Sequence, residues 1–207
     1  MEKHWAELYI STKIASGTYG SYLYGTNDDE SDLDLIVVVP SYWNIKDDDR
    51  QWAWGDTDYQ FYTEEEFIQA IKDHKLWAIE LLSQEKATLI SYRQKYFNLD
   101  LWKLRKEVSG ISSNSFVKAK KKMTIEKDYD LRKAKKSLFH SIRVLMFGIQ
   151  IAKNGKIVDF AEANKYLDEI NAMESNNWED YRKKYKKIQN YYHSELVKLC
   201  PMPKENE

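Results

Sequence analysis

The hydrophobic and polar positions of the first hundred residues predict a mixed α/β region. The stretch from Ser31 to Val39 ends in the run Leu-Ile-Val-Val-Val and stops at Pro40, which is typical of a strand. Residues 56–62 alternate in character and predict a second strand. Residues 3–12 indicate a helix, and the short stretch 14–16 fits either a strand or a helix end.

A helix is expected directly after the second strand. Thr63-Glu64-Glu65-Glu66 has the form of a capping box, with Thr63 as the N-cap and Glu66 three residues later. We expect this helix to continue to about Ser83. The polar segment 41–50, which contains three consecutive aspartates, is expected to connect the two strands.

The second half of the chain is almost free of strand patterns. Gly155 is expected to end a helix, Asp159 with Glu162 to begin the next, and Asn177 with Asp180 to begin the last. Helical patterns cover residues 93–107, 115–127, 130–153, 159–171 and 177–199. We therefore expect an α+β protein, with a mixed α/β module over residues 1–92 and an α-helical module over residues 93–207.

The charge distribution supports two modules of different character. Residues 1–100 carry 19 acidic and 9 basic side chains, a net charge of −10, whereas the remaining residues carry 14 acidic and 23 basic ones, a net charge of +9. An acidic module that handles an anionic substrate would need cations to mediate the contact.

Composition excludes several classes of protein. The longest aliphatic run, Leu35 to Val39, is far shorter than the roughly 20 residues that a membrane helix needs, so no membrane association is expected. The N-terminus mixes both charges and is not expected to be a signal peptide. The single cysteine, Cys200, cannot form an internal disulfide, which fits a cytoplasmic protein. Nothing in the sequence indicates the oligomeric state.

The stretch from Gly20 to Asp34 carries the most informative chemistry. Asp32 and Asp34 are two residues apart, so on a strand both carboxylates point to one face. Alone they would repel each other and have raised pKa values, whereas Mg²⁺ ions would remove that penalty. Upstream, Gly20-Ser21 and Gly25 form a small-residue turn where phosphate oxygens can approach backbone N–H groups and a hydroxyl.

A third carboxylate is expected on a neighbouring strand, because phosphoryl transfer with two metals commonly needs a further ligand. Asp58 lies on the second predicted strand, and Asp56 is its rival because it points the same way. We prefer Asp58 because it lies deeper in the apolar part of the strand.

Gly20-Ser21, ten intervening residues and Asp32-Leu33-Asp34 resemble the signature of the DNA polymerase β-like nucleotidyltransferase superfamily. The looser order Asp58, Tyr62, Phe67 and Glu80 resembles a bacterial and phage branch, in which a helical segment with a His-x-x-Arg pair follows. Here that pair is His140 and Arg143. An Asn-Pro pair often seen shortly before the Glu80 equivalent is absent, because residues 74–77 read His-Lys-Leu-Trp.

The resemblance implies a palm-like catalytic module and a role for each motif. Asp32 and Asp34 would hold two Mg²⁺ ions, with Mn²⁺ as an alternative, and Asp58 would hold the catalytic metal and activate the acceptor. Ser21 with Gly20 would bind the terminal phosphates. The implied reaction joins NMP from an NTP to an acceptor hydroxyl and releases pyrophosphate. The acceptor stays open between a nucleic-acid end, a small molecule and a protein.

Residues 130–153 predict a helix with one basic face. Arg132, Lys133, Lys136, His140 and Arg143 fall within an arc of about 100° at the helical repeat. A triphosphate would suit this set, and Lys136, His140 and Arg143 are the tightest subset, so we predict that these three contact the nucleotide. A solvated basic face is the competing interpretation. At the level of the whole chain, the alternative is a catalytically silent protein on the same fold that binds a nucleotide, a partner or RNA.

Overall fold

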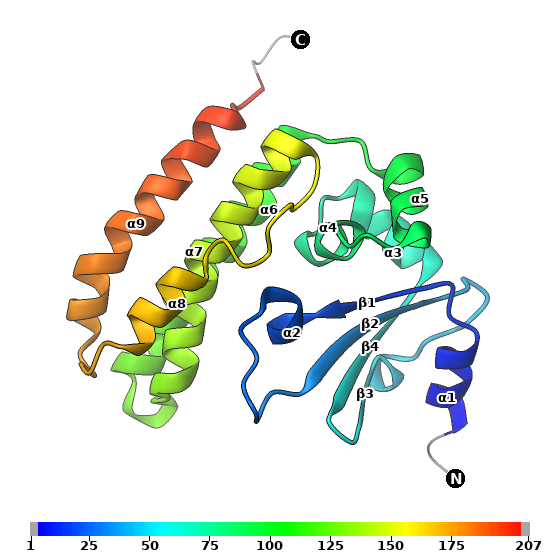
Figure 1. Cartoon of the computed structure of the whole chain (residues 1–207), viewed down its shortest axis with the longest axis horizontal. Coiled ribbons are helices and arrows are strands. Elements are labelled where there is room, and N and C mark those ends of the chain that lie inside the picture. Colours follow the sequence, from blue (N-terminus) through cyan, green and yellow to red (C-terminus); the bar gives the residue numbers. More distant parts are fainter. Residues whose placement is uncertain (1–3, 204–207) are drawn as a thin grey trace. The chain divides into compact units, whose positions relative to one another are not determined.

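The computed structural model describes residues 4–203, and the first unit of the chain, residues 1–98, is built around a four-stranded sheet (Figure 1). The strand order is β1-β2-β4-β3, in which β1 and β2 are antiparallel, β2 and β4 parallel, and β4 and β3 antiparallel. The strands are β1 (Ala15–Tyr19), β2 (Leu33–Val39), β3 (Gln51–Trp54) and β4 (Thr57–Thr63).

The central strand β2 is buried on both faces. Ile36 and Val38 point to a core shared with α3 (Glu64–Lys72), α4 (Leu76–Leu82) and α5 (Ala87–Tyr96). Val37 and Val39 point to a second core on the opposite face, together with residues of α1 (His4–Ser11). The alternation of side chains along a strand therefore explains why this apolar run has no polar position.

The strand predictions were right in kind but incomplete. β3 was missed, because it is only four residues long and directly follows the acidic 3₁₀ turn η1 (Asp47–Asp49). It forms a hairpin with β4 around Gly55, whose φ of 58° lies in the left-handed region that glycine adopts without strain. Of the residues 14–16, Ala15 and Ser16 begin β1, and Ile14 lies in a bend just before it. Residue 3 of the predicted helix 3–12 lies outside the described residues.

The predicted capping box is confirmed, but the helix that follows is shorter than expected. Thr63 accepts a hydrogen bond from the Glu66 backbone N–H, and the Glu66 side chain accepts one from the Thr63 backbone N–H. The helix α3 ends at Lys72, because His74 has a φ of 59° and turns the chain before α4 begins. The single helix expected to reach Ser83 is therefore two helices.

The second unit, residues 99–207, contains only helices among its described residues. Its elements are α6 (Leu101–Thr124), the 3₁₀ turn η2 (Glu126–Asp128), α7 (Leu131–Asn154), α8 (Asn164–Asn171) and α9 (Trp178–Leu199). Its core joins residues of all four helices, among them Ala119, Leu138, Ile170 and Tyr181.

The prediction of two helices over 93–107 and 115–127 is wrong, because α5 ends at Tyr96 and α6 then runs without a break from Leu101 to Thr124. Its middle, Ser109 to Ser115, is rich in serine and reads as a break, yet it packs against α7. The Ser112 hydroxyl donates to the Ser141 backbone oxygen at 2.7 Å, and a Cβ on Gly148 would lie 2.9 Å from Val108. Small residues let the two helices approach closely, and this tertiary packing outweighs weak helix propensity.

Two of the three predicted boundaries in this unit are confirmed. Gly155 ends α7 with a φ of 70°, and the Asn177 side chain accepts from the Glu179 backbone N–H at the start of α9. The predicted helix start at Asp159 is wrong, because α8 begins only at Asn164. The Gln150 side chain instead holds this loop, accepting from the Val158 and Asp159 backbone N–H groups.

The α+β class is confirmed, with a mixed sheet in the first unit and helices in the second. The predicted boundary at residues 92 and 93 remains a prediction about independently folding domains. Within residues 4–203, no helix is both long enough and apolar enough to cross a membrane.

Candidate active site

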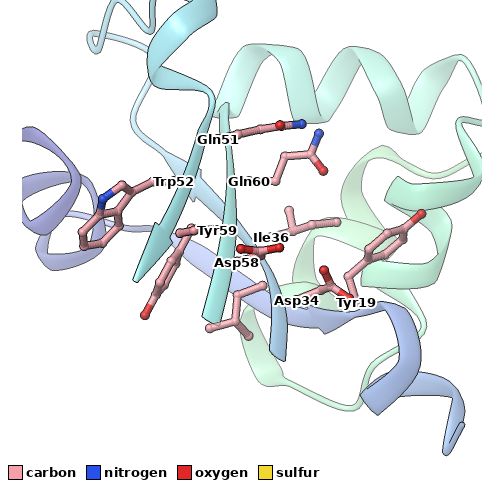
Figure 2. Close-up of a pocket in the computed structure, with 10 residues that line it drawn as sticks. Tyr19, Asp34, Ile36, Gln51, Trp52, Asp58, Tyr59 and Gln60 are labelled. Carbon is pink, nitrogen blue, oxygen red and sulfur yellow. The ribbon is translucent and has the colours of Figure 1, made fainter. Parts of the chain in front are cut away.

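Two aspartates from neighbouring strands meet at one end of the sheet. Asp34 on β2 and Asp58 on β4 are direct partners in the parallel ladder. Directly opposed residues project to the same face, so the two carboxylates lie side by side, as Figure 2 shows. They share this face with Ile36 and Val38, which enter the helix-covered core farther along β2.

The carboxylates open into a cavity of about 410 Å³ that is formed by the sheet of the first unit. Tyr19 pairs with Asp34 across β1 and β2, and Ala53 pairs with Asp58 across β3 and β4. The cavity is lined by Tyr19, Asp34, Leu35, Ile36, Gln51, Trp52, Ala53, Asp58, Tyr59 and Gln60 (Figure 2).

Gly20 brings its backbone directly against the Asp34 carboxylate. Its φ is 68°, and a Cβ built on it would lie 1.9 Å from Asp34 Oδ2. No side chain fits in that space, and L-residues rarely adopt that backbone conformation. The Gly-Ser motif and the second aspartate of the Asp-x-Asp motif are therefore in contact, although 14 residues separate them in sequence.

The segment after Gly20 is a short helix, α2 (Gly20–Tyr24), where the sequence suggested only a turn. Ser21 is half-buried within it and does not line the cavity. Gly25 ends α2 with a φ of 65°, and its N–H donates to the Ser21 backbone oxygen. Gly25 thus shapes the segment that carries Ser21.

Two buried side chains hold this segment in place: Gln84, which the sequence did not single out, and Glu80, which belongs to the family resemblance. The Gln84 amide accepts from the Thr18 N–H at 3.2 Å and donates to the Thr18 oxygen at 2.8 Å, so it pairs with the edge strand β1. The Tyr24 hydroxyl donates to Glu80 Oε2 at 3.1 Å. Both contacts join residues about 60 positions apart, so no local sequence pattern predicts them.

Electrostatics set Asp34 apart from the other carboxylates. Burial raises the pKa of Asp34, and the nearby carboxylates of Asp58 and then Asp32 raise that pKa further. The ionised form of Asp34 is therefore disfavoured until a cation balances it. This is the electrostatic environment expected of a cation-binding carboxylate.

The rival carboxylates occupy different positions. Asp32 precedes β2, is exposed and does not line the cavity, so the two aspartates of the motif are not both on the strand. Asp56 lies in the turn before β4, where its backbone oxygen accepts from the Leu33 N–H at 2.7 Å. The expectation that Asp56 lies on the strand is therefore wrong, and Asp56 does not line the cavity.

The donor set suits a hard divalent cation. Within residues 4–203, no three side chains of His, Cys, Asp or Glu are arranged as a complete metal site. Mg²⁺ is commonly held by one or two carboxylates together with waters and substrate phosphates, so an aspartate pair is a sufficient protein contribution. The raised pKa of Asp34 and the close approach of Gly20 to its oxygen fit this group.

The basic residues on α7, in the second unit, differ from the prediction. Arg132, Lys133 and Lys136 are exposed as expected, but Arg143 is only 8% exposed. Its guanidinium lies 5.2 Å from the ring centre of Phe139 and 5.9 Å from that of Phe147. The predicted basic face therefore does not extend to Arg143, because α7 is buried on nearly every side beyond Ser137.

His140 is neutral rather than cationic at physiological pH. Burial lowers its pKa to about 3, and the charges of Arg143 and Lys118 lower it as well. Its Nδ1 lies 2.8 Å from Arg143 Nη2, so the neutral ring accepts a hydrogen bond from the guanidinium. His140 therefore adds no positive charge to the predicted basic face of α7.

A sheet that presents paired carboxylates beside a glycine-serine segment is the core of a nucleotide-handling enzyme. The family model described as "Nucleotidyltransferase domain" matches residues 2–137, so the chain belongs to this family. It is accordingly a transferase of phosphorus-containing groups that acts on an NTP, and the resemblance drawn from the motifs is confirmed. None of the curated proteins matches this chain.

Proposed function

We propose that this protein is a Mg²⁺-dependent nucleotidyltransferase that transfers NMP from an NTP to an acceptor hydroxyl and releases pyrophosphate. The observation that carries the proposal is the pairing of Asp34 with Asp58 across parallel strands, beside a cavity and against the backbone of Gly20. Membership of the nucleotidyltransferase family supplies the reaction class.

In this proposal Asp34 and Asp58 hold the metal, and Asp32 contributes from just before β2. Two bound Mg²⁺ ions, or Mn²⁺ in their place, would neutralise the substrate phosphates and the charge that develops on the leaving pyrophosphate. The carboxylates would otherwise repel an anionic triphosphate. A bound cation would thus allow the acidic module to bind an anionic substrate.

The reaction itself is an in-line displacement. Asp58 takes the proton of the acceptor hydroxyl, whose oxygen forms a bond to the α-phosphorus while the bond between the α-phosphorus and the bridging oxygen breaks. Gly20 and Ser21 are proposed to bind the terminal phosphates through a backbone N–H and a hydroxyl, with Gly25 shaping their helix.

Lys136, His140 and Arg143 are proposed as further nucleotide contacts, with roles revised by their environments. Lys136 is exposed and would offer a full charge to a phosphate. His140 would act as a neutral hydrogen-bond partner that orients the guanidinium of Arg143.

The test is direct. The whole chain is incubated with each α-³²P-labelled NTP and Mg²⁺, with total cellular RNA, protein and small-molecule extract as acceptors. Labelled product or NMP that depends on Mg²⁺ and on Asp58 supports the proposal. Nucleotide binding without release of pyrophosphate would instead support the catalytically silent alternative. That result is not expected, because the Asp34–Asp58 pair proposed for catalysis is present.

A further inference from the structure

Two glutamines lie on the cavity floor directly beside the aspartate pair. Gln60 is two residues beyond Asp58 on β4, and Gln51 is its direct partner on the edge strand β3. Gln51, Gln60, Asp34 and Asp58 all line the cavity, and Figure 2 shows the two amides side by side on the face that carries the carboxylates. Nothing in the proposed reaction uses these amides.

The registers define this floor as two adjacent rows. One row runs Tyr19, Asp34, Asp58, Ala53 across the four strands, and the next runs Gly17, Ile36, Gln60, Gln51. In the second row, only the glutamines on β4 and β3 have polar side chains. Within residues 4–203, neither amide makes a hydrogen bond to another group of the protein. Their donors and acceptors therefore remain available to a ligand.

Given the proposed function, the strand order indicates which ligand the two glutamines face. Gly20, proposed to bind phosphate, follows β1, whereas the glutamines lie on β4 and β3 at the other side of the sheet. In-line displacement requires the attacking oxygen to approach opposite the leaving pyrophosphate. With phosphates at the β1 side and Asp58 on β4, the acceptor approaches from the side of β4 and β3.

The charge of the cavity restricts the acceptor further. Its lining contains two aspartates and no lysine or arginine. Arg50, adjacent to Gln51 in sequence, is engaged elsewhere, because its guanidinium contacts Glu66 at 2.6 Å and Asp47 at 3.2 Å. Proteins that position nucleic acids do so largely through cationic contacts to phosphates, and this cavity offers none. A volume of about 410 Å³ suits one small ligand.

We propose that Gln51 and Gln60 bind the acceptor, and that this acceptor is a small molecule without phosphate that presents neighbouring hydroxyl or amino groups to the two amides. One hydroxyl of that molecule loses its proton to Asp58 and forms the new bond to the α-phosphorus, and pyrophosphate leaves. The amides select the acceptor by hydrogen bonds and determine which hydroxyl reaches Asp58.

The experiment uses the whole chain with Mg²⁺, α-³²P-labelled NTPs and four acceptor probes. The probes are myo-inositol, D-glucosamine, a 5′-phosphorylated oligoribonucleotide with a free 3′ end, and a peptide containing serine, threonine and tyrosine. The variants are Gln60→Leu and Gln51→Leu, which keep most of the side-chain volume and remove the hydrogen bonds. Gln94→Leu is the matched control, because Gln94 is exposed on α5 and does not line the cavity.

The expected result is label on inositol or glucosamine, with the KM for that acceptor raised about three- to tenfold in each cavity variant, the scale of one neutral hydrogen bond. The Kd for the NTP, measured by calorimetry, is expected to change less than about twofold, and Gln94→Leu to match the wild type. A KM effect without a Kd effect distinguishes acceptor binding from a structural role or a contact to the nucleobase.

Three results would overturn the assignment. They are label on the oligoribonucleotide or the peptide alone, weakened NTP binding in Gln60→Leu, and formation of NMP with no label on either small acceptor. A chain that neither binds NTP nor forms NMP with Mg²⁺ would instead refute the proposed function itself, so the two failures are distinguishable.

Discussion

Asp34 with Asp58 in the first unit and His140 with Arg143 in the second are both neighbouring ionisable pairs, and they respond to the repulsion between like charges in opposite ways. Asp34 is half-buried and Asp58 is exposed, whereas Arg143 is buried and His140 is half-buried. The pKa of Asp34 is raised first by burial and then by the neighbouring carboxylates of Asp58 and Asp32. The pKa of His140 is lowered to about 3, so its ring is neutral and accepts a hydrogen bond from Arg143. The repulsion between His140 and Arg143 is removed because the histidine is neutral. The repulsion between the carboxylates is removed only when a cation binds.

This difference separates a ligand site from a supporting contact. A cluster of like charges that opens into a cavity is relieved when a ligand of opposite charge binds. A neutral histidine offers a phosphate a hydrogen bond but no charge. Substitution of the sheet carboxylates should therefore affect mainly activity, and substitution of the buried Arg143 or its partner His140 mainly stability.

The largest effect is expected from the paired carboxylates. Asp34→Asn or Asp58→Asn should reduce NMP transfer by at least about 10²–10³-fold, because each removes a charge that stabilises the transition state through the metal. Asp56→Asn is the control, since Asp56 lies in an exposed turn, and it should retain activity within a few-fold. Equal losses at Asp56 and Asp58 in the labelled-NTP assay would contradict this assignment.

Gly20→Ala should come next, because it combines strain with obstruction. The added methyl would meet Asp34 Oδ2 and displace the carboxylate, so transfer should fall by about 10²-fold or more. Gly55→Ala has a similar φ of 58° and open space around the new methyl. It should cost only about 1–2 kcal/mol of stability from the left-handed conformation, measured by urea unfolding, and leave transfer intact.

Arg143→Ala should mainly destabilise the helical unit. Arg143 is buried, and its loss removes a hydrogen bond to His140 and contacts with two aromatic rings, so the free energy of unfolding should fall by about 1.5–3 kcal/mol. Lys136→Ala, at an exposed position, should change stability by less than about 0.5 kcal/mol. It should instead weaken NTP binding about three- to tenfold in calorimetry. If Arg143→Ala instead weakened NTP binding and Lys136→Ala instead lowered the free energy of unfolding, Arg143 would be a surface contact to the nucleotide.

His140 predicts a specific pH dependence of stability. Its pKa is about 6.5 when unfolded and about 3 when folded, so between these values the unfolded chain binds more protons. The free energy of unfolding should therefore fall as the pH drops below about 6.5 and approach its lower limit near pH 3. In His140→Gln, chemical denaturation at several pH values should show a shallower fall. An unchanged slope would mean that other groups dominate acid unfolding.

The smallest effect is expected from the acidic pair in the absence of a cation. Because the folded pKa of Asp34 is raised, folding is penalised at any pH above the ordinary carboxyl range, and Asp34→Asn removes that penalty. The Tm of this variant without divalent ions should be equal to or a few degrees above that of the wild type. Adding Mg²⁺ should raise the Tm of the wild type more than that of the variant, and an equal rise would place the ion elsewhere.

Strand-based reasoning from the sequence was reliable for the site region because its signals are local. The β-branched run of β2 buries both faces, and the two-residue alternation places Asp34 on the face of Ile36 and Val38. The motif Gly20-Ser21, at its fixed spacing from Asp32-Leu33-Asp34, marked position 20 as part of the site before its backbone conformation was known. These features depend on side chains within a few residues or on one motif, which is why no fold was needed to see them.

Only the tertiary structure decided which charged residues face a ligand. Asp58 and Asp56 are two residues apart in sequence, yet the turn at Gly55 places one on the strand beside Asp34 and the other outside it. Helical periodicity could group Arg143 with Lys136, but burial of α7 on nearly all sides depends on packing between helices that are distant in sequence. The pairing of Gln51 with Gln60 likewise required the register of β3, a strand of only four residues. Periodicity defines a face of an element, but the remainder of the fold determines what covers that face.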